Sequence, residues 1–158
     1  MLAEDKFKTL VDIAPLISID LILKNEKGEV LLGKRKNKPA YGFFFVPGGR
    51  VRKNEKLGAA FQRLVQTELG IAISGVSRKF LGVYEHFYDD CFCGNNTSTH
   101  YIVLAYELFA NRNYNMLPQE QHSQYSWMNI ETLSNSDIVH QYTKDYFNNS
   151  VVNWGRDG

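Results

Sequence analysis

The sequence predicts an α/β (α+β) fold in which a mixed β-sheet is sandwiched between helices. The first observation is that strand patterns stand both before and after one central helical pattern, an order that favours a sheet with helices on both faces. The second is a length of 158 residues with 44% hydrophobic and 13% aromatic content, which suits one packed core. No internal repeat or linker interrupts the chain. We therefore expect residues 1–158 to form a single domain.

The first third of the chain predicts a helix and then a hairpin. Apolar residues recur at three-to-four spacing in Glu4–Ile13, which is typical of a short amphipathic helix, and Pro15 ends it. Leu16–Lys24 alternates and is rich in isoleucine, so it predicts a strand. Glu29–Lys34 predicts its hairpin partner after a glycine-containing turn. The short apolar run Phe43–Val46 predicts a buried strand.

A helical pattern follows and then gives way to strands. In Glu55–Leu69 the apolar residues share one helix face, and Gly70 is placed to cap the C-terminal end. The elements expected after it are two longer strands, a short strand and a C-terminal helix: Lys79–Tyr88, Thr99–Phe109, Tyr125–Met128 and Asn135–Phe147.

Composition excludes several classes of partner. A formal net charge of +1 predicts no nucleic-acid partner, because such proteins present a basic patch or stripe. No stretch approaches the ~20 apolar residues that span a bilayer, so no membrane segment is expected. The first ten residues carry acids and lysines and lack the apolar core of a signal peptide, which favours the cytoplasm. In that compartment we expect Cys91 and Cys93 to be reduced thiols.

Glu68 lies in the last turn of the predicted central helix. A carboxylate at that end faces the negative pole of the helix dipole, which is unfavourable by about 0.3–1 kcal/mol. A bound cation is one candidate for the compensating partner. A solvated surface glutamate is the alternative, and spacing alone favours it.

The segment from Gly49 to Ile71 resembles the Nudix box, whose pattern is Gly, five residues, Glu, seven residues, Arg-Glu-apolar-x-Glu-Glu-x-Gly-apolar. The positions that match are Gly49, Glu55, Arg63, Val65, Glu68, Gly70 and Ile71. Leu64 and Thr67 stand where the family has glutamates. Positions 64, 67 and 68 share one face of a regular helix, so this face is expected to keep one carboxylate and to bind one Mg²⁺ per subunit.

Beyond the box, the chain is similar to the GDP-mannose mannosyl hydrolase branch of the Nudix family. The matching segments are Pro15–Asp20, Leu31–Arg35, Phe45–Arg50, His86–Asp90, Thr99–Tyr101 and Glu120–His122. The resemblance implies a Nudix fold and Mg²⁺-dependent hydrolysis of GDP-mannose, and of GDP-glucose. Water would attack the anomeric carbon with inversion and release GDP and free sugar. The resemblance also implies a homodimer, with Mn²⁺ able to substitute for Mg²⁺.

The resemblance further implies a metal site and a general base. Glu68, Gln121 and the backbone carbonyl of Gly48 would bind the metal, and His122 would be the base. An imidazole suits that role because its ordinary pKa of about 6.5 is close to neutral pH. Composition alone does not single out His122, since the chain has three other histidines: His86, His100 and His140.

The remaining roles concern the substrate. Arg35 and Arg50 would neutralise the departing diphosphate, because a guanidinium fork matches phosphate oxygens. Asp20 would belong with them to the catalytic set. The further substrate contacts implied are His86, Tyr101, Lys34 and Phe7. Without the resemblance, residues 34–36 equally predict the basic end of an edge strand. By the logic of the wider family, Glu55 and Arg63 would form a bracing ion pair.

Three functions remain open from the sequence. The first is hydrolysis at the sugar carbon. The second is ordinary Nudix pyrophosphatase chemistry, which would give a nucleoside monophosphate and a sugar phosphate. The third is a non-catalytic protein that binds a nucleotide sugar. The N-terminal helix is equally open, since its apolar face suits a dimer contact or packing on its own core.

Overall fold

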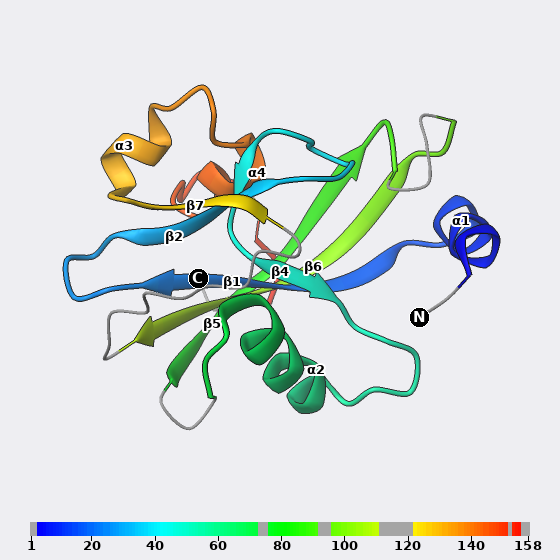
Figure 1. Ribbon diagram of the computed structural model, residues 1–158, viewed down its shortest axis with the longest axis horizontal. Coiled ribbons are helices and arrows are strands. Elements are labelled where there is room, and N and C mark those ends of the chain that lie inside the picture. Colours follow the sequence, from blue (N-terminus) through cyan, green and yellow to red (C-terminus); the bar gives the residue numbers. More distant parts are fainter. Residues whose placement is uncertain (1–2, 73–75, 92–95, 111–121, 152, 156–158) are drawn as a thin grey trace.

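A computed structural model describes residues 3–72, 76–91, 96–110, 122–151 and 153–155 (Figure 1). The elements in chain order are α1 (Glu4–Ile13), β1 (Leu16–Lys24), β2 (Val30–Arg35), β3 (Phe44–Phe45), β4 (Gly48–Arg50), α2 (Leu57–Leu64), η1 (Val65–Leu69), β5 (Val76–Tyr88), β6 (Thr99–Ala110), β7 (His122–Met128), α3 (Ile130–Ser134) and α4 (Gln141–Asp145).

The strands form one mixed sheet in the order β3-β2-β1-β6-β5, with β4 paired to β1 and β7 paired to β2. The central strands β1 and β6 run parallel along their whole pairing, from Leu16 opposite Tyr101 to Lys24 opposite Phe109, whereas β5 and β6 are antiparallel. The helix α2 covers one side of the sheet, and α3 and α4 cover the other (Figure 1). The predicted fold class is confirmed.

The elements with strong periodicity begin and end where the sequence predicts. The bounds of α1 and β1 agree residue for residue, and Gly70 adopts the left-handed conformation of a helix C-cap, with φ of 68°. The central helix begins two residues later than expected, at Leu57, because Lys56 is extended and acts as the N-cap residue. Its last turn, η1, is a π-helix, a wider turn with i→i+5 hydrogen bonds.

The predicted C-terminal helix Asn135–Phe147 is confirmed only for α4 and is wrong for residues 135–140. The structure has two short helices, α3 and α4, joined by turns and by a bridge of Val139 to Phe44. Phe44 on β3 donates its N–H to the carbonyl of Ile138 and accepts the N–H of His140, so this segment lies along β3 instead of coiling. Tertiary pairing therefore overrides the local helical pattern.

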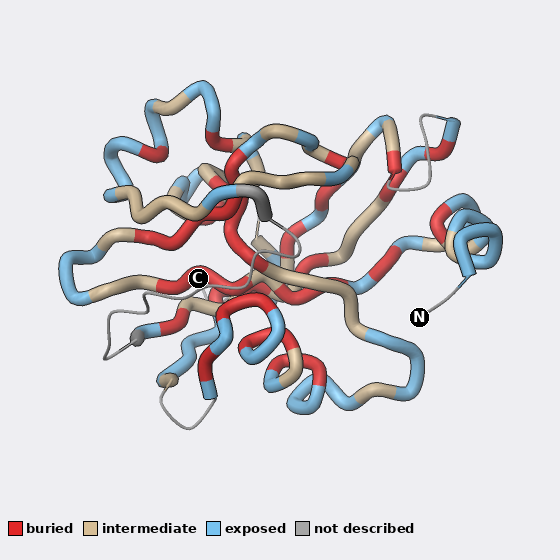
Figure 2. Tube along the Cα trace, in the orientation of Figure 1, coloured by how far each residue is buried: buried red, intermediate tan, exposed pale blue. Residues whose placement is uncertain are grey.

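Alternation along β1 separates two apolar layers. Ile19, Leu21 and Leu23 face the α2 side and belong to the core beneath that helix. Ile22 faces the other side and packs in the layer that includes residues of α3 and α4. The buried trace follows the middle of the sheet (Figure 2). Ser18 and Asp20 have the parity of Ile22, so they lie on the α4 side.

The glycines of β4 allow two close approaches. Gly48 pairs with Asp20 and Gly49 with Ile19 on β1. A Cβ on Gly49 would overlap the Cδ2 atom of Leu64, which is buried on α2. A side chain at position 49 would therefore push the Nudix-type helix away from the sheet.

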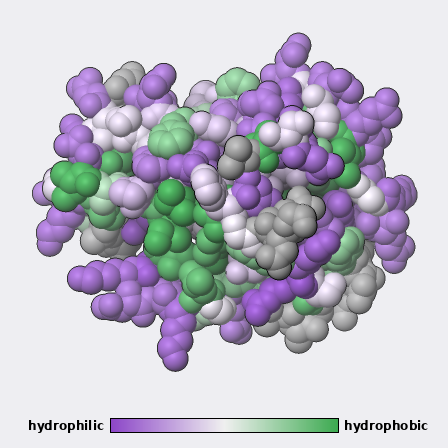
Figure 3. All heavy atoms as spheres, turned by 180° about the vertical axis from the view of Figure 1, so that it is seen from behind, coloured by the Kyte–Doolittle hydropathy of each residue, from purple (hydrophilic) through white to green (hydrophobic). Residues whose placement is uncertain are grey.

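Apolar side chains gather in the middle of the face seen from behind, among hydrophilic ones (Figure 3). Among the described residues, no helix is both long and apolar enough to cross a membrane.

Cys91 is buried and disulfide-bonded, so the expected reduced thiol is wrong at this position. Cys93 lies outside the described residues.

Two glycine substitutions test the close approach. Gly49→Ala should lower the free energy of unfolding by about 1–3 kcal/mol, because the new methyl group overpacks the buried Leu64 side chain. The matched control is Gly58→Ala on α2, where a Cβ meets open space. It should raise stability by about 0.5–1 kcal/mol through helix propensity. Denaturant unfolding measures the free energy of unfolding of both variants. Equal changes in the two variants would contradict the close approach of Gly49 to Leu64.

Candidate functional site

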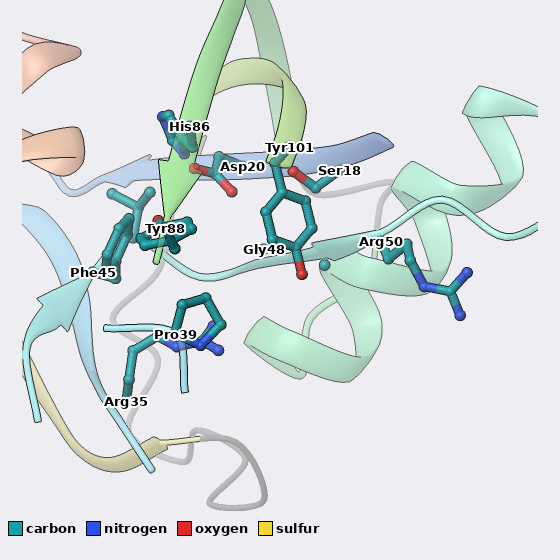
Figure 4. A pocket seen from close by; sticks show the side chains of 12 residues that line it. Ser18, Asp20, Arg35, Pro39, Phe45, Gly48, Arg50, His86, Tyr88 and Tyr101 are labelled. Atoms are coloured by element: carbon teal, nitrogen blue, oxygen red, sulfur yellow. The ribbon is translucent and has the colours of Figure 1, made fainter. Parts of the chain in front are cut away.

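A pocket of about 80 Å³ opens on the α4 side of the sheet (Figure 4). Its lining combines two arginines, a carboxylate, an imidazole and aromatic rings. The lining residues are Ser18, Asp20, Arg35, Pro39, Phe45, Val46, Gly48, Gly49, Arg50, His86, Tyr88 and Tyr101. Of the residues assigned to the site from the sequence, six lie in this lining: Asp20, Arg35, Gly48, Arg50, His86 and Tyr101.

Strand parity brings these side chains together. On β6, Tyr101 is opposite His86 of β5 in the antiparallel register. Tyr88 follows His86 by two residues and therefore has the same orientation. Ser18 and Asp20 present the same side of β1, which runs parallel to β6. The pocket is thus built from alternate positions of three adjacent strands.

Asp20 is the carboxylate of this pocket. Its Oδ2 atom accepts a hydrogen bond from the hydroxyl of Tyr146. Burial raises the pKa of Asp20 to about 7, although the Tyr146 hydrogen bond and the Arg35 charge both oppose this shift. Near neutral pH the group therefore stands close to its midpoint between carboxylic acid and carboxylate.

His86 is the imidazole of the pocket, and its side chain is almost completely buried. Burial lowers the pKa of His86 to about 3, and the nearby His140 adds to the shift. The ring is therefore neutral at physiological pH. Among the described residues its Nε2 atom has no hydrogen-bond partner, which leaves this nitrogen available to a ligand.

The two arginines reach the pocket from different directions. Arg35 ends β2, and its charge opposes the burial effects that raise the pKa values of Asp20 and Tyr101. The Arg50 guanidinium extends away from the other labelled side chains (Figure 4) and lies over the Phe7 ring, 5.4 Å from its centroid. Phe7 itself does not line the pocket and packs beside Val11 and Leu16. Lys34 pairs with Phe44 and also stands outside the lining.

Glu68 is buried, with 3% of its surface exposed, so it is not the solvated glutamate that spacing alone favours. Leu64, which stands where the family has a glutamate, is also buried and packs over Gly49. Thr67 is exposed, so it does not share a side with them as a regular helix predicts. The wider π-turn of η1 changes the angle between successive residues, which accounts for this difference.

The oxygen donors near this helix fit a hard divalent cation such as Mg²⁺. Glu68 supplies a buried carboxylate, and Gly48 supplies a carbonyl from β4, which Leu64 and Gly49 hold close to α2. Within the described chain, no cluster of three or more His, Cys, Asp or Glu side chains could hold a metal alone. Any metal here would depend on backbone, amide or substrate oxygens.

Glu55 and Arg63 form the expected ion pair. Nε of Arg63 lies 2.8 Å from Oε2 of Glu55, and the same guanidinium donates to the carbonyl of Arg50 at 2.9 Å. Glu55 also accepts the N–H of Arg52. The hydrogen bonds from Arg63, and to a smaller extent the one from Arg52, lower the pKa of Glu55 to about 2. The pair therefore ties the turn before α2 to the strand that carries Arg50.

The predicted general base lies on the strand that pairs with β2. His122 begins β7, and its backbone is opposite Arg35 of β2, next to a register shift. Gln121 lies outside the described residues.

Several residues in or next to the pocket are not predicted by the sequence. Tyr88 could have been found, since it follows His86 by two positions in a predicted strand. Phe45 was assigned to the core alone, yet it also lines the pocket and stacks on His140 at 4.7 Å between ring centroids. Tyr146 contacts Asp20 across 126 positions of sequence, and no local pattern signals that contact.

Comparison with known proteins identifies the family. The chain matches the NUDIX domain over residues 14–149. It therefore belongs to the Nudix family of hydrolases, whose members typically use divalent metal ions.

One curated relative is the low-salt glycan biosynthesis protein Agl8 of Haloferax volcanii. It is 43% identical over 121 residues, which cover 77% of this chain and 75% of that protein. Among solved structures, the MutT Nudix hydrolase of Burkholderia pseudomallei superposes with a TM-score of 0.68 at 22% identity, over 87% of this chain and 99% of that one. The MutT protein of Methanosarcina mazei Go1 gives 0.67 at 24% identity, over 85% and 92%. These two likenesses show the fold.

The raised pKa of Asp20 predicts a particular pH dependence of stability. The folded protein holds the Asp20 proton up to about pH 7, whereas the unfolded chain releases it near 3.8. Stability is therefore lost as pH rises between these values. Asp20→Asn cannot ionise and keeps an acceptor for Tyr146. The unfolding free energy of this variant minus that of the wild type should be about 1–3 kcal/mol larger at pH 8 than at pH 4. Urea unfolding at several pH values measures this, and a constant difference would exclude the shift.

Proposed function

We propose that this protein hydrolyses GDP-mannose, and GDP-glucose, to GDP and free sugar by water attack at the anomeric carbon with inversion. One observation carries the proposal: the Nudix-type helix buries Glu68 while Leu64 replaces a neighbouring family glutamate with an apolar contact. Phosphorus chemistry in this family draws on several carboxylates of that helix. A helix reduced in this way suits attack at carbon, which needs charge neutralisation at the leaving group more than a metal-activated water.

Glu68, the carbonyl of Gly48 and Gln121 would hold Mg²⁺, and Mn²⁺ would substitute for it. When bound, the metal would neutralise charge on the diphosphate of the leaving GDP. With one buried carboxylate on the described part of this helix, one ion per subunit is the expected stoichiometry.

The chain's own residues would supply the rest of the chemistry. Arg35 lies at the pocket wall, where its guanidinium would bind the diphosphate and receive its growing charge. Arg50 would assist from β4, with Lys34 and Phe7 as outer contacts to the nucleotide. His122 would take the proton of the attacking water. Its place opposite Arg35 on the neighbouring strand supports this assignment, since base and leaving-group contact must lie within one active site.

The sugar would occupy the side of the pocket formed by Asp20, His86 and Tyr101. Burial raises the pKa of Tyr101, so its hydroxyl remains a hydrogen-bond donor at neutral pH. His86 is neutral and has an unpartnered nitrogen, and Asp20 is an acceptor when ionised. Such a mixture of donors and acceptors suits sugar hydroxyls. The name of the Haloferax volcanii relative, a glycan biosynthesis protein, agrees with a sugar substrate.

We place the enzyme in the cytoplasm as a homodimer, with residues 1–158 as a single Nudix domain. The substrate is a small molecule, and neither nucleic acid nor membrane is a partner. Two alternatives are distinguished by their products. A pyrophosphatase would give GMP and sugar 1-phosphate, and a non-catalytic binding protein would give no product.

Isotope labelling separates these functions. Turnover of GDP-mannose with Mg²⁺ in ¹⁸O-labelled water should place the label in free mannose and leave GDP unlabelled, because water attacks carbon. Mass spectrometry of the products measures this. Label on phosphorus, with GMP and mannose 1-phosphate as products, would overturn the proposal. Tight binding without turnover would identify a sensor.

The general base is tested by His122→Gln. The substitution should lower kcat by ~10²–10⁴-fold with a modest change in KM, because a proton acceptor is removed while substrate contacts remain. His100→Gln is the matched control, since His100 stacks on Phe87 and does not line the pocket. It should leave kcat within about twofold. Near-full activity of His122→Gln would remove this residue from the mechanism.

A further inference from the structure

Two tyrosines of the C-terminal helix contact the sugar side of the pocket. Tyr142 lies on α4, and Tyr146 is the C-cap residue of the same helix. They are four positions apart, so they project from one helix face. Each contacts a different pocket group, although neither belongs to the Nudix box nor lines the pocket itself.

Tyr146 holds one oxygen of Asp20. The tyrosine is buried, with 7% of its surface exposed, and its hydroxyl donates to Oδ2 of Asp20. The other oxygen, Oδ1, lies over Gly48, where an added Cβ would come within 2.5 Å of it. The hydrogen bond therefore fixes which oxygen faces a protein donor and which remains for a ligand.

Tyr142 holds the ring of His86. Its aromatic ring lies parallel to the imidazole, with 4.2 Å between centroids and 4° between planes. Its hydroxyl accepts the N–H of Phe87 and donates to the Phe87 carbonyl, both at 2.9 Å. Tyr142 is thus fixed to the backbone next to His86, and the imidazole has little freedom to rotate away.

The helix that carries both tyrosines is itself fixed to the pocket wall. Thr143 is fully buried and accepts the N–H of Val46, a lining residue. His140 donates its N–H to the carbonyl of Phe44 at 3.0 Å. Tyr84 packs edge-on against Tyr146 at 4.7 Å. These contacts set the position of α4 relative to β3, β4 and β5.

We propose that Tyr146 and Tyr142 are positioning residues that orient Asp20 and His86 toward the hydroxyl groups of the sugar half of a nucleotide sugar. The inference rests on the proposed function for the identity of the ligand. It adds that α4 determines affinity for the sugar half, whereas the nucleotide half is bound independently of α4. Buried phenol hydroxyls suit this role because a donor fixed by packing holds a carboxylate with little loss of entropy on binding.

Tyr146→Phe is the central test, since it removes the hydroxyl and keeps the ring. The matched control is Tyr84→Phe, which removes a hydroxyl from the same aromatic cluster. That hydroxyl accepts a hydrogen bond from Asn153. Titration calorimetry with Mg²⁺ gives the Kd of GDP-mannose and of GDP for each variant, kinetics give kcat and KM, and thermal unfolding gives Tm.

For Tyr146→Phe we expect kcat/KM for GDP-mannose to fall by about 10–100-fold, because a misplaced contact group costs about that much. The Kd of GDP-mannose should rise while that of GDP stays within about twofold. Tyr84→Phe should lower Tm by about as much as Tyr146→Phe does, and it should leave the affinities for GDP-mannose and GDP unchanged. Equal kinetics in the two variants, or equal weakening of GDP and GDP-mannose, would overturn the proposal.

Two further variants keep the test decisive if Tyr146→Phe folds poorly. Tyr142→Phe should weaken GDP-mannose more than GDP in the same way. In an Asp20→Ala background, Tyr146→Phe should add little to the loss of GDP-mannose affinity, because the group that Tyr146 positions is absent. A fully additive double variant would contradict the proposal. If the wild type binds GDP-mannose without hydrolysing it, the proposed reaction fails while the affinity comparison still decides the positioning role.

Discussion

The two-residue alternation of β1 is the constraint on which both the core and the pocket depend. Odd positions from Ile19 to Leu23 are buried under α2, and the even positions Ser18 and Asp20 line the pocket. A shift of one residue would exchange these two sets and place Asp20 in an apolar layer. The register is fixed because β1 pairs with β2, β4 and β6 at once. The same pairings that stabilise the core therefore also place the pocket carboxylate.

The close approach of β4 to α2 joins this sheet to the Nudix-type helix. Gly49 accommodates the Leu64 side chain, and the pair of Glu55 and Arg63 closes the turn between strand and helix. A glutamate at position 64 would place a charge at this buried contact, where only a cation could offset its desolvation. Leucine at that position stabilises the same approach without a cation. The apolar substitution thus removes a potential metal ligand and at the same time makes helix packing independent of metal.

The sequence predicted what depends on local pattern and missed what depends on distant contacts. Periodicity located α1 and β1, and the resemblance to the Nudix box located Glu68 and its helix. Periodicity did not reveal the π-turn, because the same apolar spacing suits both helix types over so few residues. The non-helical chain before α4 follows from its pairing with Phe44, and the contact of Tyr146 with Asp20 spans nearly the whole chain. Neither leaves a trace in neighbouring residues.

Burial gives the side of the pocket that we propose for the sugar its chemical character. It raises the pKa of Asp20 to about 7 and lowers that of His86 to about 3, so neither group carries a full charge near neutral pH. Charge on the described pocket wall is instead concentrated at Arg35 and Arg50. The weakly charged side with Asp20 and His86 would suit a neutral polyhydroxyl half of a ligand, and the two arginines would suit an anionic half. The burial that destabilises an ionised Asp20 also strengthens each hydrogen bond it makes, because water competes less there. Under the proposed function, the stability lost at this position would be the physical basis of selective sugar binding.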